Sequence, residues 1–416
     1  MKLLTFLGAG ENKETTYVWQ GQEATALFAP LASCYFLKPE QIVVFLTRKA
    51  REKNFQAFLD KVPQGIMVEG VDIPMGSAAE ELWQIFDCIS SQVAPGEEVA
   101  FDITHGLRHH PLLGLLAAIF LRSGLDIDLK AVLYGAFDVG MQVSQGVTPM
   151  FDLTPLLTLL EWSVAADRFN RTGDANYLAS LLLKQRKGLA QSAGKDKGKL
   201  SQVGDLGRLA NDLIEISQSL RLIRPVLAMQ KISGLGKRIE NAIPILNESA
   251  ATHPFSLLLD RVGESFASLG FVNPLSPETI VESIAKQRRI ITWYVEHEQW
   301  VQAISLSREW LVNWFMIHLK INNLVQKDAR QRVEGVVNAE AYDLKQAKQA
   351  KIPFSPLFLN LVPEIEVALN LWNSLTDVRN DIDHAGMREQ PKDPDVLIQC
   401  IRQIVETLNT LPVEPR

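Results

Sequence analysis

Two side chains near the C-terminus, Arg379 and His384, are suited to metal-free cleavage of RNA. They stand five residues apart in LWNSLTDVRNDIDHAG, and Asn380 follows the arginine directly. An imidazole with its ordinary pKa of about 6.5 can act as general acid or base while a ribose 2′-hydroxyl attacks the adjacent phosphorus and a cyclic phosphate forms. A guanidinium can stabilise the charge of the transition state, and Asn380 can orient the phosphate or the imidazole. Glu309 and Asn373 could assist, although no spacing links them to the pair.

The spacing of Arg379 and His384 restricts where such a site can form. Five residues of continuous α-helix rotate by about 500°, so the two side chains would diverge by roughly 140°. One of them must therefore lie beyond a helix end, or two copies of the motif must meet across an interface. The alternative is an exposed set of ion pairs in which Asp381 and Asp383 join the two residues.

A second polar cluster follows a hydrophobic segment in VAFDITHGLRHHP. It brings five polar or small residues together within seven positions, at Asp102, Thr104, His105, Gly106 and Arg108. The glycine lets the backbone approach a ligand, the hydroxyl and the imidazole can hydrogen-bond it, and the guanidinium can hold a phosphate. The turn is therefore a candidate ligand site. For Asp102 the alternative is a turn-forming role.

The histidines around this turn raise the question of a metal ion. His105 and His109 stand four residues apart, but Gly106 occupies the place that the general-base glutamate has in the HExxH pattern. We therefore expect no metal in this protein. For His109 and His110 the favoured interpretation is helix capping or partly buried polar contacts.

The loop GAGENKETT follows the first hydrophobic segment and is expected to precede a helix. Its glycines can let backbone N–H groups approach a phosphate or nucleotide, and its polar side chains can donate hydrogen bonds to a base or ribose. Lys13 stands where the dinucleotide fingerprint requires glycine or alanine, and a GK[ST] ending is missing, so neither a Rossmann cofactor nor a triphosphate loop is expected. The alternative is a tight turn without a ligand. The candidate residues are Gly8, Ala9, Gly10, Asn12, Thr15 and Thr16.

Both candidate ligand loops would be positioned by a mostly parallel, Rossmann-like α/β sheet. Short apolar runs alternate with helical stretches, and the turns that follow the runs lie where open α/β sheets bind ligands. Thr154 and Pro155 predict a helix, capped by the threonine, that runs to Gly173, so we place the end of this domain at residue 152. The predicted strands are Leu3–Leu7, Ile42–Leu46, Ile66–Ile73, Val99–Ile103 and Ala131–Leu133.

The rest of the chain is predicted to be helical and would position Arg379 and His384. Residues 153–275 form an expected all-α linker region, in which the glycine- and cation-rich stretch 185–204 is predicted to be a mobile surface loop. Residues 276–416 are expected to form an all-α bundle. Helices are predicted after Ser276-Pro277-Glu278, over the segment that holds Trp300, from Pro356 to about Val378, and from Asp395 to Leu408. Helical spacing favours core packing over base stacking for Trp293, Trp300, Trp310 and Trp314.

Composition restricts the function further. A chain of 416 residues is expected to form two or three domains, and its net charge of −6 disfavours nonspecific coating of duplex DNA. Any nucleic acid would bind at a local pocket. The 3 cysteines lack CxxC spacing, which argues against a disulfide framework and a zinc site. The N-terminus does not read as a signal peptide, and no apolar stretch has membrane-spanning length, so we expect a cytoplasmic protein.

Two segments of the N-terminal domain resemble those of a known family. The FDITHG turn resembles the DxTHG motif of CRISPR-associated CARF-domain proteins, and LGAGENKETTYVW is similar to their first ligand loop. The resemblance implies that residues 1–152, as a dimer, bind a cyclic oligoadenylate made by a type III CRISPR complex. Cyclic tetra-adenylate is the first expectation and the hexa-adenylate the second. The implied contacts are Gly8, Gly10, Thr15, Thr16, Thr104, His105, Gly106 and Arg108.

The motif from Arg379 to His384, placed in a helical bundle before Ala385-Gly386, resembles the catalytic motif of HEPN ribonucleases. The order of the two resemblances matches CARF–HEPN effectors over nearly the whole chain. Together they imply a cyclic-oligoadenylate-activated, metal-independent endoribonuclease that cleaves single-stranded RNA in antiviral defence. They also imply a homodimer or higher oligomer, no cofactor, and no stable complex with the CRISPR effector.

Two other functions remain open from the sequence. One is a nucleotide-responsive regulator that binds RNA or DNA through the middle region and the cations of 185–204 without cleaving it. The other is a sensor domain that degrades its own cyclic ligand, with Thr104 or His105 positioning a 2′-hydroxyl.

Overall fold

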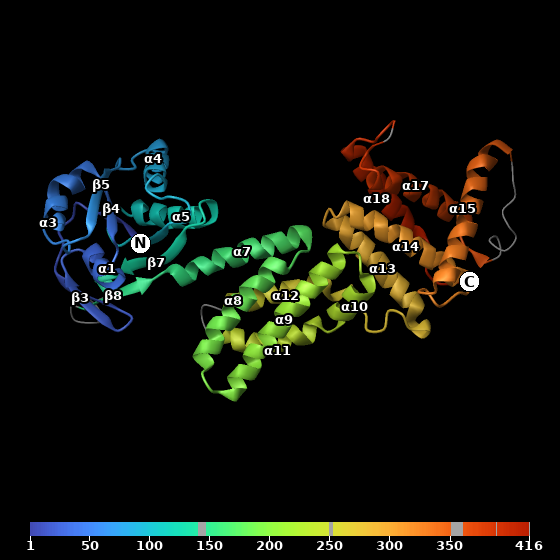
Figure 1. Cartoon of the computed structure of the whole chain (residues 1–416), viewed down its shortest axis with the longest axis horizontal. Helices are drawn as coiled ribbons and strands as arrows, with labels where there is room; N and C mark the ends of the chain where they lie inside the picture. The colour runs from blue at the N-terminus through green and yellow to red at the C-terminus, as the bar shows by residue number, and fades with distance from the viewer. Residues whose placement is uncertain (140–146, 249–252, 351–360, 388, 416) are drawn as a thin grey trace. The chain divides into compact units, whose positions relative to one another are not determined.

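The computed structural model describes residues 1–139, 147–248, 253–350, 361–387 and 389–415. The chain contacts separate it into two units, Met1–Leu160 and Glu161–Arg416, which are coloured from blue to green and from green to red in Figure 1. None of the helices formed by the described residues is long and apolar enough to cross a membrane.

The N-terminal unit is built on one sheet with the strand order β3-β2-β8-β7-β6-β1-β4-β5. The five predicted strands are confirmed, and the central ones are mutually parallel, because β1 pairs in parallel with both β4 and β6. Their nearly continuous apolar runs fit strands that are buried on both faces. The strands are β1 Lys2–Leu7, β2 Thr15–Trp19, β3 Gln22–Ala26, β4 Gln41–Leu46, β5 Met67–Asp72, β6 Glu98–Asp102, β7 Asp128–Gly135 and β8 Val147–Asp152.

Helices cover both faces of this sheet. Leu3 and Ile42 pack on one face against a cluster that includes Phe58 of α3, while Leu4 and Val43 pack on the other against residues of α4 and α5. Alternate residues of one strand therefore pack into two separate hydrophobic cores, one on each face of the sheet. The helices are α1 Ala29–Leu37, α2 Arg48–Ala50, the π-helical turn Arg51–Phe55, α3 Gln56–Leu59, α4 Ala79–Ser90 and α5 His109–Gly124.

The glycine loop after β1 leads into a β-hairpin and not into the predicted helix. Strands β2 and β3 are antiparallel, and Trp19 pairs with Gln22 across the two-residue turn Gln20-Gly21. Both turn residues have positive φ, 50° and 79°, as hairpin turns of this length require. The sequence offers one sign of the hairpin, Gly21 after the β-prone run Thr15–Trp19, but the residues of β3 are not β-prone and give no strand pattern. Strand β8 was not predicted either.

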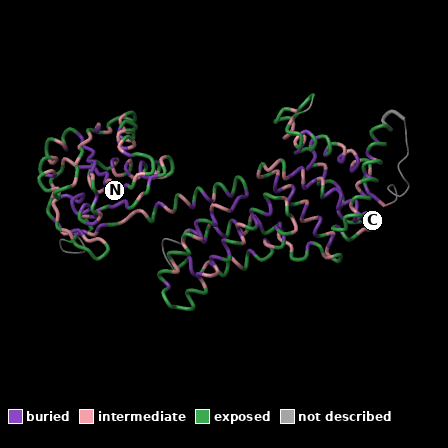
Figure 2. The backbone as a smooth tube through the Cα atoms, in the orientation of Figure 1, coloured by how far each residue is buried: buried purple, intermediate pink, exposed green. Residues whose placement is uncertain are grey.

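The C-terminal unit is entirely helical over its described residues and shares one hydrophobic core, seen as the buried tracks along its helices in Figure 2. The first helix, α7 (Thr154–Thr172), spans the boundary between the units and ends before Gly173 as predicted. The hydroxyl of Thr154 does not cap it but accepts a hydrogen bond from the amide of Val132. The next helices are α8 Asn176–Ala193, α9 Lys197–Arg221, α10 Pro225–Ser233, α11 Leu235–Asn247 and α12 His253–Ala267.

The prediction of a mobile loop at residues 185–204 is wrong. This stretch forms the end of the α8–α9 helical hairpin, and Asp196 caps α9 by accepting from the amides of Gly198 and Lys199. The stretch carries few apolar residues of its own. The buried residues on either side of it, such as Leu182 and Leu206, hold the two helices together through tertiary packing that outweighs local propensity.

The remaining helices form the predicted bundle. Helix α14 packs against α13, α15, α17 and α18, and its Trp310 and Trp314 are fully buried, so core packing is confirmed for both. Helix α17 starts at Ile365, and residues 356–360 of the predicted segment lie outside the described residues. Helix α15 was not predicted. The bounds are the 3₁₀ turn Pro277–Thr279, α13 Ile280–Glu296, α14 Trp300–His318, α15 Lys327–Ala350, α17 Ile365–Asp383 and α18 Pro394–Thr410.

Candidate functional site

Arg379 and His384 lie at the C-terminal end of α17. The amide of Gly386 donates to the carbonyl of Asp381 and that of Ala385 to the carbonyl of Ile382, each at 2.9 Å, and Ala385 has φ 52°. These two bonds form a Schellman motif, which explains why the helix stops here. His384 is the capping residue itself, and its amide still bonds to the carbonyl of Asn380.

The helix end does not bring Arg379 and His384 together within one chain. Because the break follows His384, the side chains keep the divergence of roughly 140° expected for a continuous helix. Arg379 instead forms an ion pair with Asp383, with 3.1 Å between Nε and Oδ2. The imidazole of His384 is exposed and makes no hydrogen bond with any described residue.

The other residues considered around this pair have different surroundings. Asn380 is exposed, whereas the side chain of Asn373 donates to the carbonyl of Ala341 at 3.0 Å. Glu309 forms an ion pair with Arg330. Asn373 and Glu309 are therefore engaged within the bundle.

A buried arginine that the sequence reasoning missed lies beside this site. The guanidinium carbon of Arg308, on α14, lies 3.3 Å from the ring centroid of Trp372 on α17. Burial lowers the pKa of Arg308 to about 10; Glu334 and Glu309 oppose this shift, and Arg379 and Arg330 add to it. The sequence contains a sign of this burial, because Arg308 lies on the apolar face of its helix together with Ile304, Leu311 and Phe315, which are buried.

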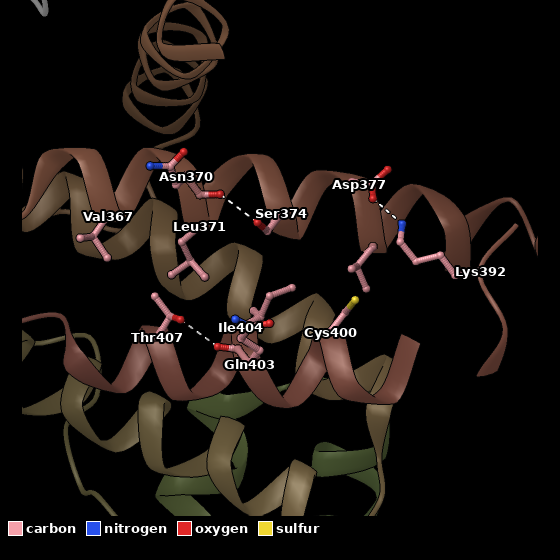
Figure 3. A pocket seen from close by; sticks show the side chains of 11 residues that line it. Val367, Asn370, Leu371, Ser374, Asp377, Lys392, Cys400, Gln403, Ile404 and Thr407 are labelled. Atoms are coloured by element: carbon pink, nitrogen blue, oxygen red, sulfur yellow. Dashed lines mark hydrogen bonds and ion pairs between the residues drawn. The ribbon is translucent and has the colours of Figure 1, made fainter. Parts of the chain in front are cut away.

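A groove lies between α17 and α18 on the face of α17 that leads to His384. It has a volume of about 420 Å³ and mixes apolar side chains with Asn370, Ser374 and Gln403. Figure 3 shows Leu371 and Ile404 between the two helices, and Lys392 directed at Asp377 at one end. Asp377 and His384 are seven residues apart, so they lie two turns from each other on one face of the helix.

The candidate ligand turn at the end of β6 is tightly organised by its own residues. Asp102 is fully buried, and its carboxylate accepts from the hydroxyl of Ser33 and from the amide of Thr104. The hydroxyl of Thr104 in turn accepts from the amide of Gly135 at 2.8 Å. Asp102 and Thr104 therefore fix the shape of the turn.

His105 and Gly106 continue this organisation. The Nε2 atom of His105 accepts a hydrogen bond from the amide of Ala29 at 3.1 Å. Burial lowers the pKa of His105, against an opposing effect of Asp102, so the imidazole is neutral at pH 7. Gly106 has φ 111°, and a Cβ atom there would lie 3.0 Å from the Cβ atom of His110. Only glycine suits this position.

The first glycine loop lies against the same turn, as expected for loops at the carboxyl ends of the neighbouring strands β1 and β6. A Cβ atom on Gly8 would lie 3.5 Å from the amide nitrogen of Gly106. Asn54, which the sequence reasoning missed, donates to the carbonyls of Gly8 at 2.8 Å and Gly10 at 2.9 Å. Asn54 belongs to a π-helical turn, a feature common at functional sites.

The remaining predicted ligand residues are divided between loop and sheet. Arg108 and Gly10 are exposed, and the side chain of Asn12 folds back onto the carbonyl of Gly10. Thr15 and Thr16 lie in β2, which β7 and β8 separate from β6. Their hydroxyls bond to those of Thr148 and Thr25, respectively, so both are occupied within the sheet. Ala9 lies in the loop and packs against the core below it.

The neighbouring histidines make the polar contacts expected of them. His109 bonds to the carbonyl of Met75 at 2.8 Å, and Nδ1 of His110 accepts from the amide of Leu107. Burial, with a smaller effect of His109, lowers the pKa of His110 to about 4. No group of three or more metal-binding side chains occurs among the residues that the structure describes.

The protein thus combines an α/β sheet unit, with a turn at Asp102–Arg108, and a helical unit in which Arg379 and His384 lie at the end of α17. Residues 158–270 match the family model of "CRISPR-associated protein MJ1674, second domain". The chain is also 30% identical over 165 residues to the CRISPR-associated protein MJ1674 of Methanocaldococcus jannaschii, a match that covers 39% of this chain and 24% of that protein. These similarities support a CRISPR-associated protein, and the chain spans about a quarter of the length of the relative it matches.

Proposed function

We propose that the protein is an endoribonuclease of type III CRISPR defence that a cyclic oligoadenylate activates and that needs no metal to cleave single-stranded RNA. The observation that carries the proposal is the occurrence, on one chain, of the Asp102–Arg108 turn and the exposed Arg379 and His384. The similarity of residues 158–270 to a domain of a CRISPR-associated protein supports the biological setting.

The activator binds at the edge of the sheet where the loops after β1 and β6 meet. The backbone around Gly8 and Gly106 comes close to the ligand, and exposed Arg108 binds a phosphate. His105 is neutral, so its environment favours a hydrogen bond to an adenine or ribose group over an ion pair. Cyclic tetra-adenylate is the first candidate.

Cleavage takes place in a groove that two chains share. Because Arg379 and His384 of one chain point in different directions, they cannot act on the same phosphate. The arginine and the histidine of one site therefore come from two chains. His384 of one chain accepts the proton of the 2′-hydroxyl, whose oxygen attacks the phosphorus, and water protonates the 5′-oxygen that leaves. Arg379 stabilises the pentacovalent phosphate. The groove between α17 and α18 gives the RNA room on the face of α17 that continues towards His384.

The N-terminal unit, called the sensor unit below, has a surface on which a second copy of the chain can pack. Leu112, Leu116 and Phe120 follow one another at intervals of four residues on α5, and their exposed fractions are 57%, 48% and 54%. Such an apolar stripe on a helix is typical of an interface. The activator binds two such units and shifts the protein from an inactive to an active dimer. The size of this shift equals the difference between its binding free energies for the two dimers.

The test is ribonuclease activity against a panel of cyclic oligoadenylates, in excess chelator, with a labelled single-stranded RNA. We expect shortened products only with one ring size and at the same rate with and without chelator. RNA binding without products would favour the regulator instead. Loss of the cyclic ligand in a His384→Ala variant would show that the sensor unit degrades it.

A further inference from the structure

Arg308 carries a charge that its surroundings in the bundle do not satisfy. Its side chain is only 12% exposed, and its nearest carboxylate oxygen, on Glu334, lies 3.9 Å away, too far for a good hydrogen bond. Its Nη1 atom is buried and has no hydrogen-bond partner among the described residues. A buried cation in this condition is costly, so it calls for an explanation.

Arg288 provides a comparison within the same bundle. Its guanidinium also faces a tryptophan, with 5.9 Å from its carbon atom to the ring centroid of Trp310. It donates to the carbonyls of Leu411 at 2.7 Å and Asn409 at 3.5 Å. Arg288 thus ties the end of the chain to α13, whereas Arg308 has the same kind of stacking without comparable acceptors.

The position of Arg308 links it to the cleavage site. It stacks on Trp372, and Trp372 and Arg379 are seven residues apart, two turns along the same face of α17. The charge of Arg379 contributes to the lowered pKa of Arg308, which fits two guanidinium groups that lie near each other. Asp383 is the carboxylate partner of Arg379, with 3.1 Å between Nε and Oδ2, and the side chain of Arg379 is 45% exposed.

We propose that Arg308 is a second phosphate-binding residue of the cleavage site, and that a phosphate of the RNA binds between Arg308 and Arg379. This inference rests on the proposed ribonuclease function. At the exposed part of the Arg308 side chain, a phosphate offers a closer charged acceptor than Glu334, and two guanidinium groups can bind its separate oxygens. The stack on Trp372 holds Arg308 in place before the RNA arrives.

The salt dependence of RNA binding tests this assignment directly. In a His384→Ala background, which prevents cleavage, the affinity for a labelled single-stranded RNA is measured with activator over a range of salt concentrations. Removal of one phosphate-binding side chain should reduce the slope of log affinity against log salt by about 0.7. We expect this reduction for Arg308→Met and for Arg379→Met, and an unchanged slope for Arg288→Met.

Stability and rate complete the test. Replacing a poorly satisfied buried charge with an apolar side chain is often neutral or stabilising, so Arg308→Met should keep or raise the Tm, whereas Arg288→Met should lower it. With His384 present, Arg308→Met should lower kcat about 100-fold. Should Arg308→Met fail to fold, Arg308→Lys serves instead, and it should keep the slope but lower kcat because lysine lacks the planar fork.

The outcomes separate this inference from the proposed function. A normal slope for Arg308→Met, with a reduced slope for Arg379→Met, overturns the role of Arg308 and leaves the ribonuclease intact. If Arg308→Lys shows a normal slope and the wild-type kcat, the role of Arg308 is overturned as well. RNA that fails to bind even the chain with all three arginines overturns both.

Discussion

The Asp102–Arg108 turn, called the sensor turn below because we propose that it binds the activator, differs from the end of α17 in how its polar side chains are held. Asp102, Thr104 and His105 all bond to other parts of their own unit, whereas His384 and Asn380 are exposed and form no hydrogen bond through their side chains with described residues. Internal bonds fix the sensor turn before a ligand arrives, which limits the entropy lost on binding. The side chains of His384 and Asn380 have no such support, so under the proposed function an RNA or a second chain is what orders them.

The largest effect should come from His384→Ala. If the exposed imidazole transfers protons, its removal should lower activator-dependent cleavage about 10²- to 10⁴-fold. The Tm should stay unchanged because the side chain forms no hydrogen bond with a described residue. Thr376→Ala, an exposed position on the same helix, is the control and should cleave normally. Cleavage by His384→Ala at the wild-type rate would remove the histidine from the mechanism.

A mixing experiment sharpens this prediction. When inactive Arg379→Ala and His384→Ala chains are mixed and allowed to exchange subunits, a shared site regains one intact arginine–histidine set in each mixed dimer. The mixture should then recover roughly a quarter of the wild-type activity. A site contained within one chain would recover nothing, and the argument from the divergence on α17 would fail.

The next effect concerns the stability of the sensor unit as the pH falls. The pKa of His110 is about 4 in the folded chain and about 6.5 when unfolded, so below pH 6.5 the unfolded chain binds a proton that the folded chain does not. Stability is therefore complete above pH 6.5 and is lost as the pH falls towards 4. Between pH 7 and 4.5 this loss amounts to about 2 kcal/mol.

Hydrogen exchange of peptides from β1 and β6, corrected for the intrinsic rate, measures this loss in the full chain. His110→Asn keeps an acceptor near the position of Nδ1 for the amide of Leu107 but does not titrate, so its stability should depend less steeply on pH. The pKa of His105 is also lowered, and it accounts for part of the remaining slope. Equal slopes in the two proteins would mean that His110 is not held neutral.

A smaller effect is expected from Gly106→Ala. The alanine would have to adopt φ 111° beside His110, a strain of about 1–3 kcal/mol that deforms the turn. Affinity for the activator, measured by calorimetry, should fall about 10-fold or more. Gly65→Ala is the matched control, because Gly65 has φ 90° and open space around it, so it carries a similar backbone strain away from the turn. Unchanged affinity in Gly106→Ala would place the ligand elsewhere.

Sequence patterns predicted the parts of this molecule that depend on local periodicity. The apolar runs of β1 and β4 and the helices around Trp310 follow from spacing alone. The contacts of Asn54 with the glycine loop and of Arg308 with Trp372 join distant parts of the chain, so no local pattern contains them. Residues 175–275 show no motif in the sequence, because buried helices reflect packing and not chemistry, yet the family match covers residues 158–270.

The smallest effect should come from Asp383→Asn, which tests how loosely the end of α17 is held. The ion pair of Asp383 with Arg379 has side chains that are 48% and 45% exposed, and such pairs contribute about 0–1 kcal/mol. We therefore expect a Tm close to that of the wild type and a cleavage rate within about 3-fold of it, because RNA phosphate replaces the carboxylate as the partner of Arg379. A large drop in rate would show that Asp383 positions the guanidinium for catalysis. The end of α17 would then be preorganised like the sensor turn, and the contrast between the two sites would no longer hold.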